Sequence, residues 1–501
     1  MILSGFLLWG CGRKGAEDPI AVIVKPDFFQ LPVGGEVQFS AEVFGTLDKA
    51  VQWEQKGAGG SISPSGLYKA PLKVTPCVVS TAPPVTPPLA TIQAKSVADP
   101  AAVGNGSAGT TVVRECPGEE LRSDMRSLVI GGYTVRQGQT IDMNGDNVLD
   151  LISLSKAENA VAFFLGLGRG DGSFTTMNQV PPVTVLEPVA VAVADFITEN
   201  EFTADAAIAC VAACAQGRPN IVLIQGRTQA DFSIASGPDL VLPSGKVPIL
   251  LAAGRFHGDV EARNSDLVVG TEDGSVVLFL QNRGAGTFTQ TTPITVGKPV
   301  QFEVADFNQD IFLDLAVVRE GAPDVLILLG NGVDGFSSPV SVPMPAQPTS
   351  IDVGDFNADE IPDLAAAFSS RKTVLISIGK GDGTFQDRPP IVLNSEPESI
   401  VVEDVNLDRI QPTPQIKGNP RHDIGVSLPN RGEIYVLFGD GEGNMIGNWA
   451  YKTGVAPRSL RAGFFSGSQS PTGFQTVSLV YINEDLPKPK FFLVNNSNVS
   501  P

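Results

Sequence analysis

The stretch Asp306-Phe-Asn-Gln-Asp-Ile-Phe-Leu-Asp314 places acidic or amide side chains at its first, third, fifth and ninth positions. The same spacing recurs in Asp355-Phe-Asn-Ala-Asp-Glu-Ile-Pro-Asp363 and in Asp142-Met-Asn-Gly-Asp-Asn-Val-Leu-Asp150. Apolar runs flank these stretches, as in Phe302-Glu-Val-Ala305 and Asp314-Leu-Ala-Val-Val318. We therefore predict loops of one design, each joining two β-strands of a repeated unit.

Side chains with this spacing suit calcium, a hard cation that takes roughly six to eight oxygen ligands. Asp and Asn also favour turns for local hydrogen-bonding reasons, but three copies in repeat register are hard to explain that way. Magnesium fits less well because it tolerates such flexible oxygen cages poorly. The predicted side-chain ligands are Asp142, Asn144, Asp146, Asp150, Asp306, Asn308, Asp310, Asp314, Asp355, Asn357, Asp359 and Asp363, with carbonyls from Val148, Phe312 and Ile361.

A fourth loop begins Asp404-Val-Asn-Leu-Asp408, and an insertion through Pro420 postpones its closing residue to Asp423. Its candidate ligands are Asp404, Asn406, Asp408 and Asp423, and whether this interrupted loop binds calcium stays open. The three complete loops are not EF-hands, because apolar strands flank them and the Glu required at position twelve is replaced by Ser153, Val317 and Ala366.

Units aligned on these loops begin 49 to about 60 residues apart, at Asp142, Asp195, Arg255, Asp306, Asp355, Asp404 and near Phe464. A unit of about fifty residues with several short strands and no helical periodicity predicts a propeller blade, and seven units predict a closed ring. The units resemble FG-GAP or VCBS-type repeats, the family of integrin-like propellers in many exported bacterial proteins. The resemblance implies calcium in the complete loops and metal-free blades at Asp195, Arg255 and Phe464, where ligands are missing.

The composition excludes some functions. The 501-residue chain is 42% hydrophobic with 53 Gly and 39 Pro, which suits short strands better than long helices. Its 54 acidic and 35 basic residues give a formal net charge of -19, so nucleic acid is not an expected partner.

The N-terminal segment Met1-Ile-Leu-Ser-Gly-Phe-Leu-Leu-Trp-Gly-Cys11 is apolar but too short to span a bilayer. Leu8-Trp-Gly-Cys11 resembles a lipobox, which implies cleavage and lipidation at Cys11. Trp9 and the missing basic residues depart from that pattern, so a plain secretory signal or a truncated start stays an alternative. The other cysteines suit Cys77–Cys116 and Cys210–Cys214 disulfides in an exported compartment, with buried free thiols as the alternative.

Residues 19–114 alternate short apolar runs with Gly, Pro and Ser turns, which predicts a small β-sandwich. With Trp53 as a core tryptophan, this segment resembles the bacterial immunoglobulin-like family, whose modules serve as spacers or adhesive units. We therefore expect an all-β chain: a signal and anchor segment over 1–18, an Ig-like β-sandwich over 19–114, a linker over 115–126 and a seven-bladed propeller over 127–501.

Catalytic machinery is hard to find. His257 and His422 are the chain's histidines, so His-based triads and three-histidine zinc sites are excluded. Both histidines are expected at the surface or behind metal ligands. The glycine-rich segments 166–172 and 379–383 lead into strands and predict hairpin turns rather than phosphate loops, and Arg169-Gly-Asp171 lies within the first of them.

The sequence thus predicts an exported, calcium-stabilised propeller, lipid-anchored in the bacterial envelope through Cys11. It would act as a monomeric cell-surface binding or adhesion module for a protein or glycan, not as an enzyme. The alternative is a carbohydrate-active enzyme, a polysaccharide lyase or glycoside hydrolase, with acids and bases near the centre of the ring.

Overall fold

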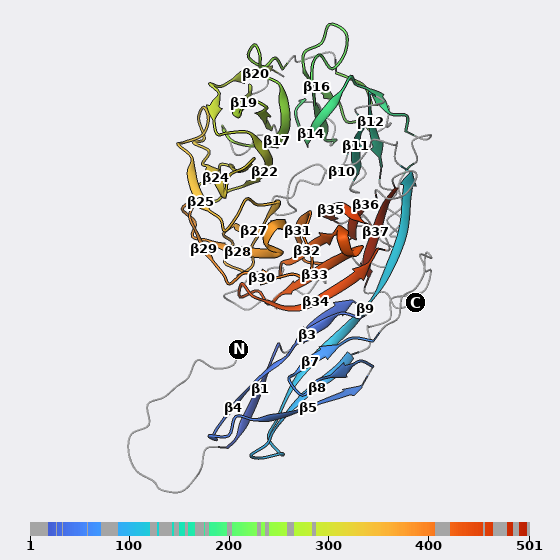
Figure 1. Ribbon diagram of the computed structural model, residues 1–501, viewed down its shortest axis with the longest axis vertical. Coiled ribbons are helices and arrows are strands. Elements are labelled where there is room, and N and C mark those ends of the chain that lie inside the picture. The colour runs from blue at the N-terminus through green and yellow to red at the C-terminus, as the bar shows by residue number, and fades with distance from the viewer. Residues whose placement is uncertain are drawn as a thin grey trace.

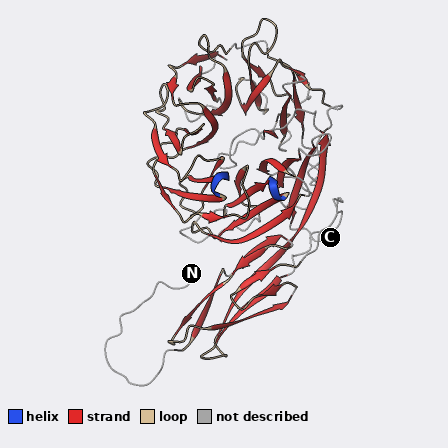
Figure 2. Cartoon of the chain, viewed as in Figure 1, coloured by secondary structure: helices blue, strands red, loops and turns tan. Residues whose placement is uncertain are grey.

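The computed structural model describes residues 19–501 except 27, 33, 58, 72–88, 121–127, 130–142, 145–149, 156–158, 166–174, 176–179, 198–202, 228–231, 236–239, 258–264, 283–286, 406–420, 454–455, 464–477, 484–489 and 498–501. The described secondary structure is β-strand, apart from the short 3-10 helices η2 (Ser369–Arg371) and η3 (Pro429–Arg431). Within these residues no helix is long and apolar enough to cross a membrane. The chain is all-β, as predicted (Figure 2).

Small antiparallel sheets follow one another along the chain from β10 onward, each a meander of consecutive strands. In order they are β10 (Leu128–Val129), β11 (Leu151–Ser155), β12 (Ala160–Phe164) and β13 (Val183–Thr184); β14 (Pro188–Ala194), β15 (Asp205–Cys210) and β16 (Ile221–Ile224); β17 (Pro248–Gly254), β18 (Asp266–Thr271), β19 (Ser275–Asn282) and β20 (Thr287–Gln290), with β21 (Ile294–Thr295) on β19; and β22 (Pro299–Ala305), β23 (Asp314–Arg319), β24 (Asp324–Leu328) and β25 (Val340–Pro343).

The later sheets repeat the pattern. They are β26 (Ser350–Gly354), β27 (Asp363–Phe368), β28 (Thr373–Gly379) and β29 (Phe385–Asp387), with β30 (Ile391–Val392) on β28; β31 (Ile400–Glu403), β32 (Asp423–Leu428), β33 (Glu433–Gly439) and β34 (Met445–Lys452); and β35 (Pro457–Gly463), β36 (Ser478–Asn483) and β37 (Lys490–Ser497). Four-residue and longer apolar runs such as Leu364-Ala-Ala-Ala-Phe368 form second strands that are buried on both faces.

The hydrophobic core lies between neighbouring sheets rather than within one layer. Val318 and Ile327 of one sheet, for example, pack with Ile351, Leu364 and Phe368 of the next. The first strands of successive sheets, β14, β17, β22, β26, β31 and β35, contact one another in turn, and β10 contacts β35. The sheets therefore surround a common centre, which is a propeller-like fold (Figure 1).

An N-terminal module precedes these sheets. Strand β1 (Ala21–Lys25) pairs with β4 (Ser40–Phe44), and β5 (Val51–Gly57) pairs with β8 (Leu89–Ser96), which pairs with β9 (Val103–Glu120). Strand β2 (Phe28–Pro32) runs parallel to β9, and β3 (Glu36–Gln38), β7 (Leu67–Lys69) and β6 (Ser61–Ile62) form a third group.

The N-terminal module and the later sheets are joined through both hydrogen bonds and core. Strand β9 continues to Glu120 and pairs with β37, so residues 115–120 of the predicted linker are strand. Strand β3 pairs with β34, and the Phe29 and Phe438 rings lie 5.9 Å apart in one shared cluster. The module is thus packed against the sheets rather than tethered to them.

One predicted disulfide is present, between Cys210 and Cys214, whose Cα atoms are 5.3 Å apart. Cys77 and Cys11 lie outside the described residues. The predicted Cys77–Cys116 pairing and the lipidation of Cys11 therefore stay predictions.

Candidate metal loops

The loop 306–314 connects β22 to β23 and folds around its own acidic side chains. The Asp306 carboxylate accepts the N–H groups of Asp310 at 3.1 Å and Ile311 at 2.8 Å. Asn308 Nδ2 donates to Asp310 Oδ2 at 2.9 Å, and Asp310 Oδ1 accepts the Phe312 N–H at 3.0 Å. The side chains at positions one, three and five are thereby brought together over one turn of backbone.

The loop 355–363, between β26 and β27, repeats this arrangement one sheet further on. Asp355 accepts the N–H groups of Asp359 and Glu360 at 3.1 and 3.0 Å, and Asn357 Nδ2 donates to Asp359 Oδ2 at 2.7 Å. Asp359 Oδ1 accepts the Ile361 N–H at 2.8 Å. Two sequences that differ at four of nine positions therefore share one loop conformation.

Each of these loops holds two non-glycine residues in the left-handed region. The φ angles are 59° at Gln309 and 74° at Ile311, and 61° at Ala358 and 66° at Glu360. A left-handed L-residue costs about 1–2 kcal/mol, more for a β-branched side chain such as that of Ile311. The repeated hydrogen bonds to Asp306 and Asp355 offset that cost and keep the acidic side chains in register.

The closing aspartate of each loop is buried and bonded to backbone. Asp314 is fully buried; its Oδ2 accepts the Phe307 N–H at 2.7 Å and its Oδ1 accepts the Gly330 N–H at 2.8 Å. Asp363 does the same with Phe356 and Gly379, at 2.7 and 2.8 Å. The closing aspartate thus ties the start of its loop to the C-terminal end of the third strand of the same sheet, β24 or β28. We call this contact the aspartate staple.

The aspartate staple recurs in sheets whose loops lack the other acids. Asp205 accepts N–H groups from Phe196, Ile197 and Gly226, at 2.8 to 3.0 Å. Further members are Asp150, Asp266 and Asp423. Asp266 was not among the predicted site residues, although it stands directly before the apolar run Leu267-Val-Val269, as Asp314 and Asp363 stand before theirs.

Burial and local charge act on the staples in the same direction. Burial, and then the negative charges of Asp306 and Asp310, raise the pKa of Asp314 to about 7, while the N–H donors oppose this shift. Burial likewise raises the pKa of Asp363 to about 7, helped by Asp355 and Asp359. The acids at positions one and five of each loop therefore disfavour ionisation of the closing aspartate, and the loops concentrate negative charge.

The donor chemistry of loops 306–314 and 355–363 fits a hard divalent cation, because the side chains at positions one, three and five offer carboxylate and amide oxygens. In the part of the chain that the structure describes, no three His, Cys, Asp or Glu side chains already converge as a metal cluster. The oxygens are instead engaged by loop N–H groups. Asn144, Asp150, Asp404 and Asp423 are described; Asp142, Asp146, Val148, Asn406 and Asp408 lie outside the described residues.

The loops lie at the seams between sheets. Leu313 donates its N–H to the Arg255 carbonyl at 3.0 Å, and Ser265 donates to the Asp195 carbonyl at 2.9 Å. Each donor precedes a closing aspartate, and each acceptor opens the loop of the preceding sheet. At the next equivalent seam the donor position holds Pro362, which has no N–H.

At the following seam, between the sheets that begin with β26 and β31, the side chain of His422 makes the equivalent contact. It is buried, and its Nδ1 donates to the Asp355 carbonyl oxygen at 2.9 Å. Gly443 of the same later sheet donates its N–H to the Phe356 carbonyl at 2.9 Å. His422 is therefore buried rather than at the surface, and it contacts the backbone of Asp355, a candidate metal ligand of the preceding sheet.

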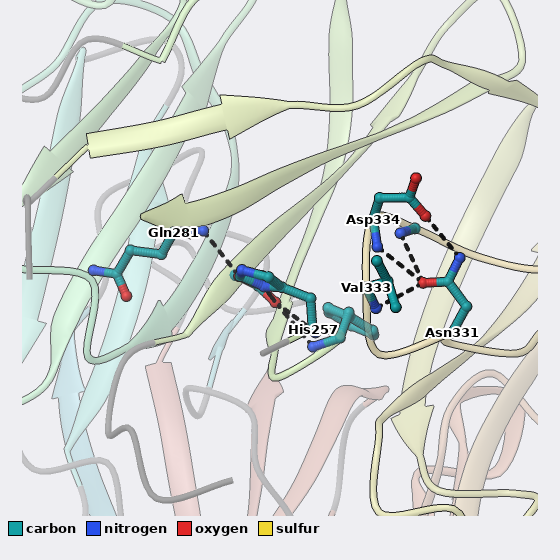
Figure 3. Close-up of polar contacts among 8 residues, drawn as sticks. His257, Gln281, Asn331, Val333 and Asp334 are labelled. Atoms are coloured by element: carbon teal, nitrogen blue, oxygen red, sulfur yellow. Dashed lines mark hydrogen bonds and ion pairs between the residues drawn. The ribbon is translucent and has the colours of Figure 1, made fainter. Parts of the chain in front are cut away.

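His257 occupies the third loop position where Asn308 and Asn357 stand in the later loops. Its Nδ1 lies 2.9 Å from the carboxylate of Asp266, and this hydrogen bond raises the pKa of His257. Figure 3 shows His257 beside the turn that carries Asn331, Val333 and Asp334, and its backbone bridges to Gly332 there. In this sheet the third loop position therefore holds an imidazole instead of an amide, and the imidazole contacts the closing aspartate, Asp266.

The first strands of neighbouring sheets are also linked by polar side chains. Ile351 donates its N–H to Gln301 Oε1 at 3.0 Å, Ile400 to Ser350 Oγ at 3.3 Å, and Leu460 to Ser399 Oγ at 2.9 Å. The acceptors occupy one position in three consecutive sheets. These side-chain oxygens accept hydrogen bonds from backbone N–H groups at strand edges, which would otherwise face the centre without a partner.

A carboxylate pair lies on these central strands. Glu303 of β22 accepts from Gln301 Nε2 at 2.9 Å, and Asp352 of β26 accepts the Val402 N–H at 2.7 Å. Burial, and then the charge of Asp352, raise the pKa of Glu303 to about 8, while Gln301 and Arg461 lower it. Glu303, Asp352 and Arg461 come from separate repeats, so no sequence motif marks an acid at the centre.

These sheets, loops and seams define a β-propeller-like protein. Residues 306–366 match the model of the FG-GAP-like repeat family, which covers both complete loops described above. No curated protein sequence matches the chain.

Three β-propeller structures resemble the fold. BBS1N, solved in complex with ARL6DN, is 15% identical with a TM-score of 0.48, covering 77% of this chain and 99% of that one. Sqt1 of Saccharomyces cerevisiae is 10% identical with a TM-score of 0.45, covering 83% and 94%. The periplasmic gluconolactonase PpgL of Pseudomonas aeruginosa is 13% identical with a TM-score of 0.38, covering 75% and 98%.

Proposed function

We propose that the chain is an exported, calcium-stabilised β-propeller that acts as a cell-surface binding module for a protein or a glycan. The observation that carries this proposal is the shared conformation of loops 306–314 and 355–363, whose acidic side chains cluster in repeat register at the seams between sheets. A fold fixed by ions at its seams leaves the connecting loops free to vary as a recognition surface.

Side chains from positions one, three and five would hold each ion: Asp306, Asn308 and Asp310 in one loop and Asp355, Asn357 and Asp359 in the next. The ion would supply positive charge that offsets their repulsion. The closing residues Asp314 and Asp363 would complete the sites while keeping their staples, because each carboxylate oxygen has a second lone pair.

The number of blades, the type of N-terminal module and the lipid anchor are parts of the same proposal. The sheets from β10 to β37, with β9 as the outer strand beside β37, support a ring of seven blades. The β-strands before them, with Trp53 packed on the core, support an Ig-like sandwich. The Cys210–Cys214 disulfide supports an oxidising, exported compartment, in which Cys11 would carry a lipid anchor.

Calorimetric titration of the purified protein with calcium tests the metal sites directly. We expect saturable calcium binding, weaker binding of magnesium, and loss of one site in each of the variants Asp306→Ala and Asp355→Ala. The matched control is Asp382→Ala, which removes an exposed turn aspartate outside both loops. Calcium heats that are unchanged in both loop variants would contradict the proposal.

The carbohydrate-active enzyme stays a second candidate, and the Glu303 and Asp352 pair favours it. A carboxyl group whose pKa is near 8 stays protonated at neutral pH and can act as a general acid beside an ionised partner. The test is depolymerisation of a polysaccharide panel by the purified protein. Turnover that Glu303→Gln and Asp352→Asn abolish would favour the enzyme over the binding module.

A further inference from the structure

The N-terminal module has one end that faces away from the propeller. Strand β9 starts there at Val103 and reaches β37 at its other end, and β3 meets β34 on the propeller side. Figure 1 shows the β1, β4 and β5 end of the module pointing away from the sheets. Two loops form this end, residues 45–50 and 97–102, and we call them the distal tip.

The two loops of the distal tip lie side by side, because Val97 donates its N–H to the Ala50 carbonyl at 3.0 Å. Leu47 is 100% exposed, and Phe44 and Val97 beside it are each 47% exposed. Ile23, diagonal to Phe44 across the β1–β4 pair, is 48% exposed. Four exposed large apolar side chains therefore lie at or near this end of the module.

The acidic residues of the distal tip are turned back onto its own backbone. Asp48 Oδ1 accepts the Ala50 N–H at 2.9 Å, and Asp99 Oδ1 accepts the Ala101 N–H at 3.0 Å. The rest of the 97–102 turn is Ala98, Pro100, Ala101 and Ala102. Lys49, the basic residue of the two loops, donates its Nζ to the Val43 carbonyl at 2.6 Å. Each charged side chain of the distal tip thus makes a hydrogen bond to nearby backbone, while Leu47 is fully exposed.

The chain enters the N-terminal module at the same end. Ala21, the first residue of β1, pairs with Phe44 directly below the 45–50 loop. Cys11 precedes Ala21 by only ten residues, a distance of at most about 35 Å for extended chain. A lipid on Cys11 would hold the distal tip within that distance of the bilayer, whereas the propeller lies at the other end of the module.

We propose that the distal tip docks on the lipid bilayer, with Leu47 inserted at the boundary between headgroups and acyl chains and Phe44 and Val97 beside it. This inference rests on the proposed lipid anchor at Cys11. A lipid chain and a second apolar contact act together on membrane affinity, since anchoring by one signal alone is marginal. Docking at the tip would orient the propeller away from the membrane, toward a partner.

The test uses the full chain in dioleoylphosphatidylcholine vesicles that contain doxyl-labelled lipid. Leu47→Trp places a fluorophore at the distal tip, and Val392→Trp places a matched control on the propeller, where Val392 is 78% exposed. We expect doxyl lipid to quench the added Trp at 47 but not at 392, and aqueous iodide to do the reverse. Iodide quenching at 47 in vesicle-bound protein would overturn the proposal.

A second arm separates tip docking from lipidation. Mass spectrometry of Cys11 tests the anchor alone. In the unlipidated variant Cys11→Ser we expect weak vesicle flotation that Leu47→Asp reduces about tenfold, since a buried Leu side chain contributes at least that factor. Flotation that Leu47→Asp leaves unchanged, or a Leu47-dependent self-association in place of flotation, would overturn tip docking even if Cys11 carries lipid.

Discussion

At the scale of single residues, aspartates do two different jobs in the same loops. The closing aspartates accept backbone N–H groups in every sheet where they are described, including sheets that lack the other acids. Among the described residues, the acids at positions one and five are brought together in loops 306–314 and 355–363, which carry the full motif. The staple thus belongs to the fold, and the remaining acids to the proposed cation.

The staple can be tested in a sheet without the full motif. Asp205→Ala leaves the N–H groups of Phe196, Ile197 and Gly226 without their acceptor in a buried position. We expect the free energy of unfolding to fall by about 2–5 kcal/mol, since unsatisfied buried donors cost roughly 1–3 kcal/mol each. Urea unfolding followed by circular dichroism measures this. The exposed Glu320→Gln should change little; equal stability of both variants would refute the staple.

The half-buried carboxyl of Glu303 predicts a pH dependence. Its folded-state pKa of about 8 lies above the ordinary value of 4.5, because of burial and Asp352, with Arg461 opposing. The folded state therefore binds this proton more tightly, and stability is greatest below about pH 4.5 and falls as pH rises through 8.

In Glu303→Gln this loss of stability disappears. We expect the variant to be more stable than the parent above pH 8, by roughly 1–3 kcal/mol given about 1.4 kcal/mol per tenfold change in proton affinity and a side chain that keeps some solvent contact. Thermal unfolding from pH 5 to 9 measures it. Parallel pH profiles of parent and variant would show that Glu303 titrates normally.

At the scale of elements, the seams carry the contacts that a linear reading does not reveal. The spacing of acids predicted loops between strands, and residues 306–314 and 355–363 do connect first to second strands. The partners across each seam, such as His422 to Asp355, come from another repeat. A repeat pattern predicts which residues occupy equivalent positions, but not which residues of another repeat they contact. The seam contacts and the Glu303–Asp352 pair could therefore not be predicted from the sequence.

The His422 contact should connect calcium binding to the next sheet. His422→Ala removes the donor to the Asp355 carbonyl, so loop 355–363 loses a fixed point while its ligands remain. In an Asp306→Ala background we expect a smaller calcium-induced rise in unfolding temperature with His422→Ala than without it. His257→Ala changes a loop that itself lacks the acidic motif and should leave that rise unchanged. Equal effects of the two histidine variants would contradict the coupling.

At the scale of the whole molecule, the N-terminal module and the propeller-like sheets share one hydrophobic cluster. Phe29, Phe39 and Tyr68 belong to it together with Phe438 and Trp449. The composition correctly predicted an all-β chain, but a linker was expected where β9 continues to Glu120. The sequence around 115–120 is poor in strand signals, and the pairing with β37, almost four hundred residues away, makes it a strand.

Because the N-terminal module and the propeller-like sheets share one hydrophobic cluster, we expect them to unfold together. We expect one cooperative calorimetric transition that includes the N-terminal module, and we expect Phe29→Ala to lower its midpoint as a whole, by the equivalent of about 3–5 kcal/mol. Hydrogen exchange should show matching protection in β9 and β37. A separate low-temperature transition confined to residues 19–111 would contradict this account.

The central claim is that cations stabilise the loops 306–314 and 355–363. The most direct measurement is thermal unfolding with EDTA and with calcium, for the parent, Asp306→Ala, Asp355→Ala and the control Asp334→Ala. We expect calcium to raise the unfolding temperature, by the equivalent of about 2.7 kcal/mol per site at a hundredfold excess of calcium over its dissociation constant. Each loop variant should reduce this rise and the control should keep it. An unfolding temperature that calcium leaves unchanged in the parent would contradict the claim.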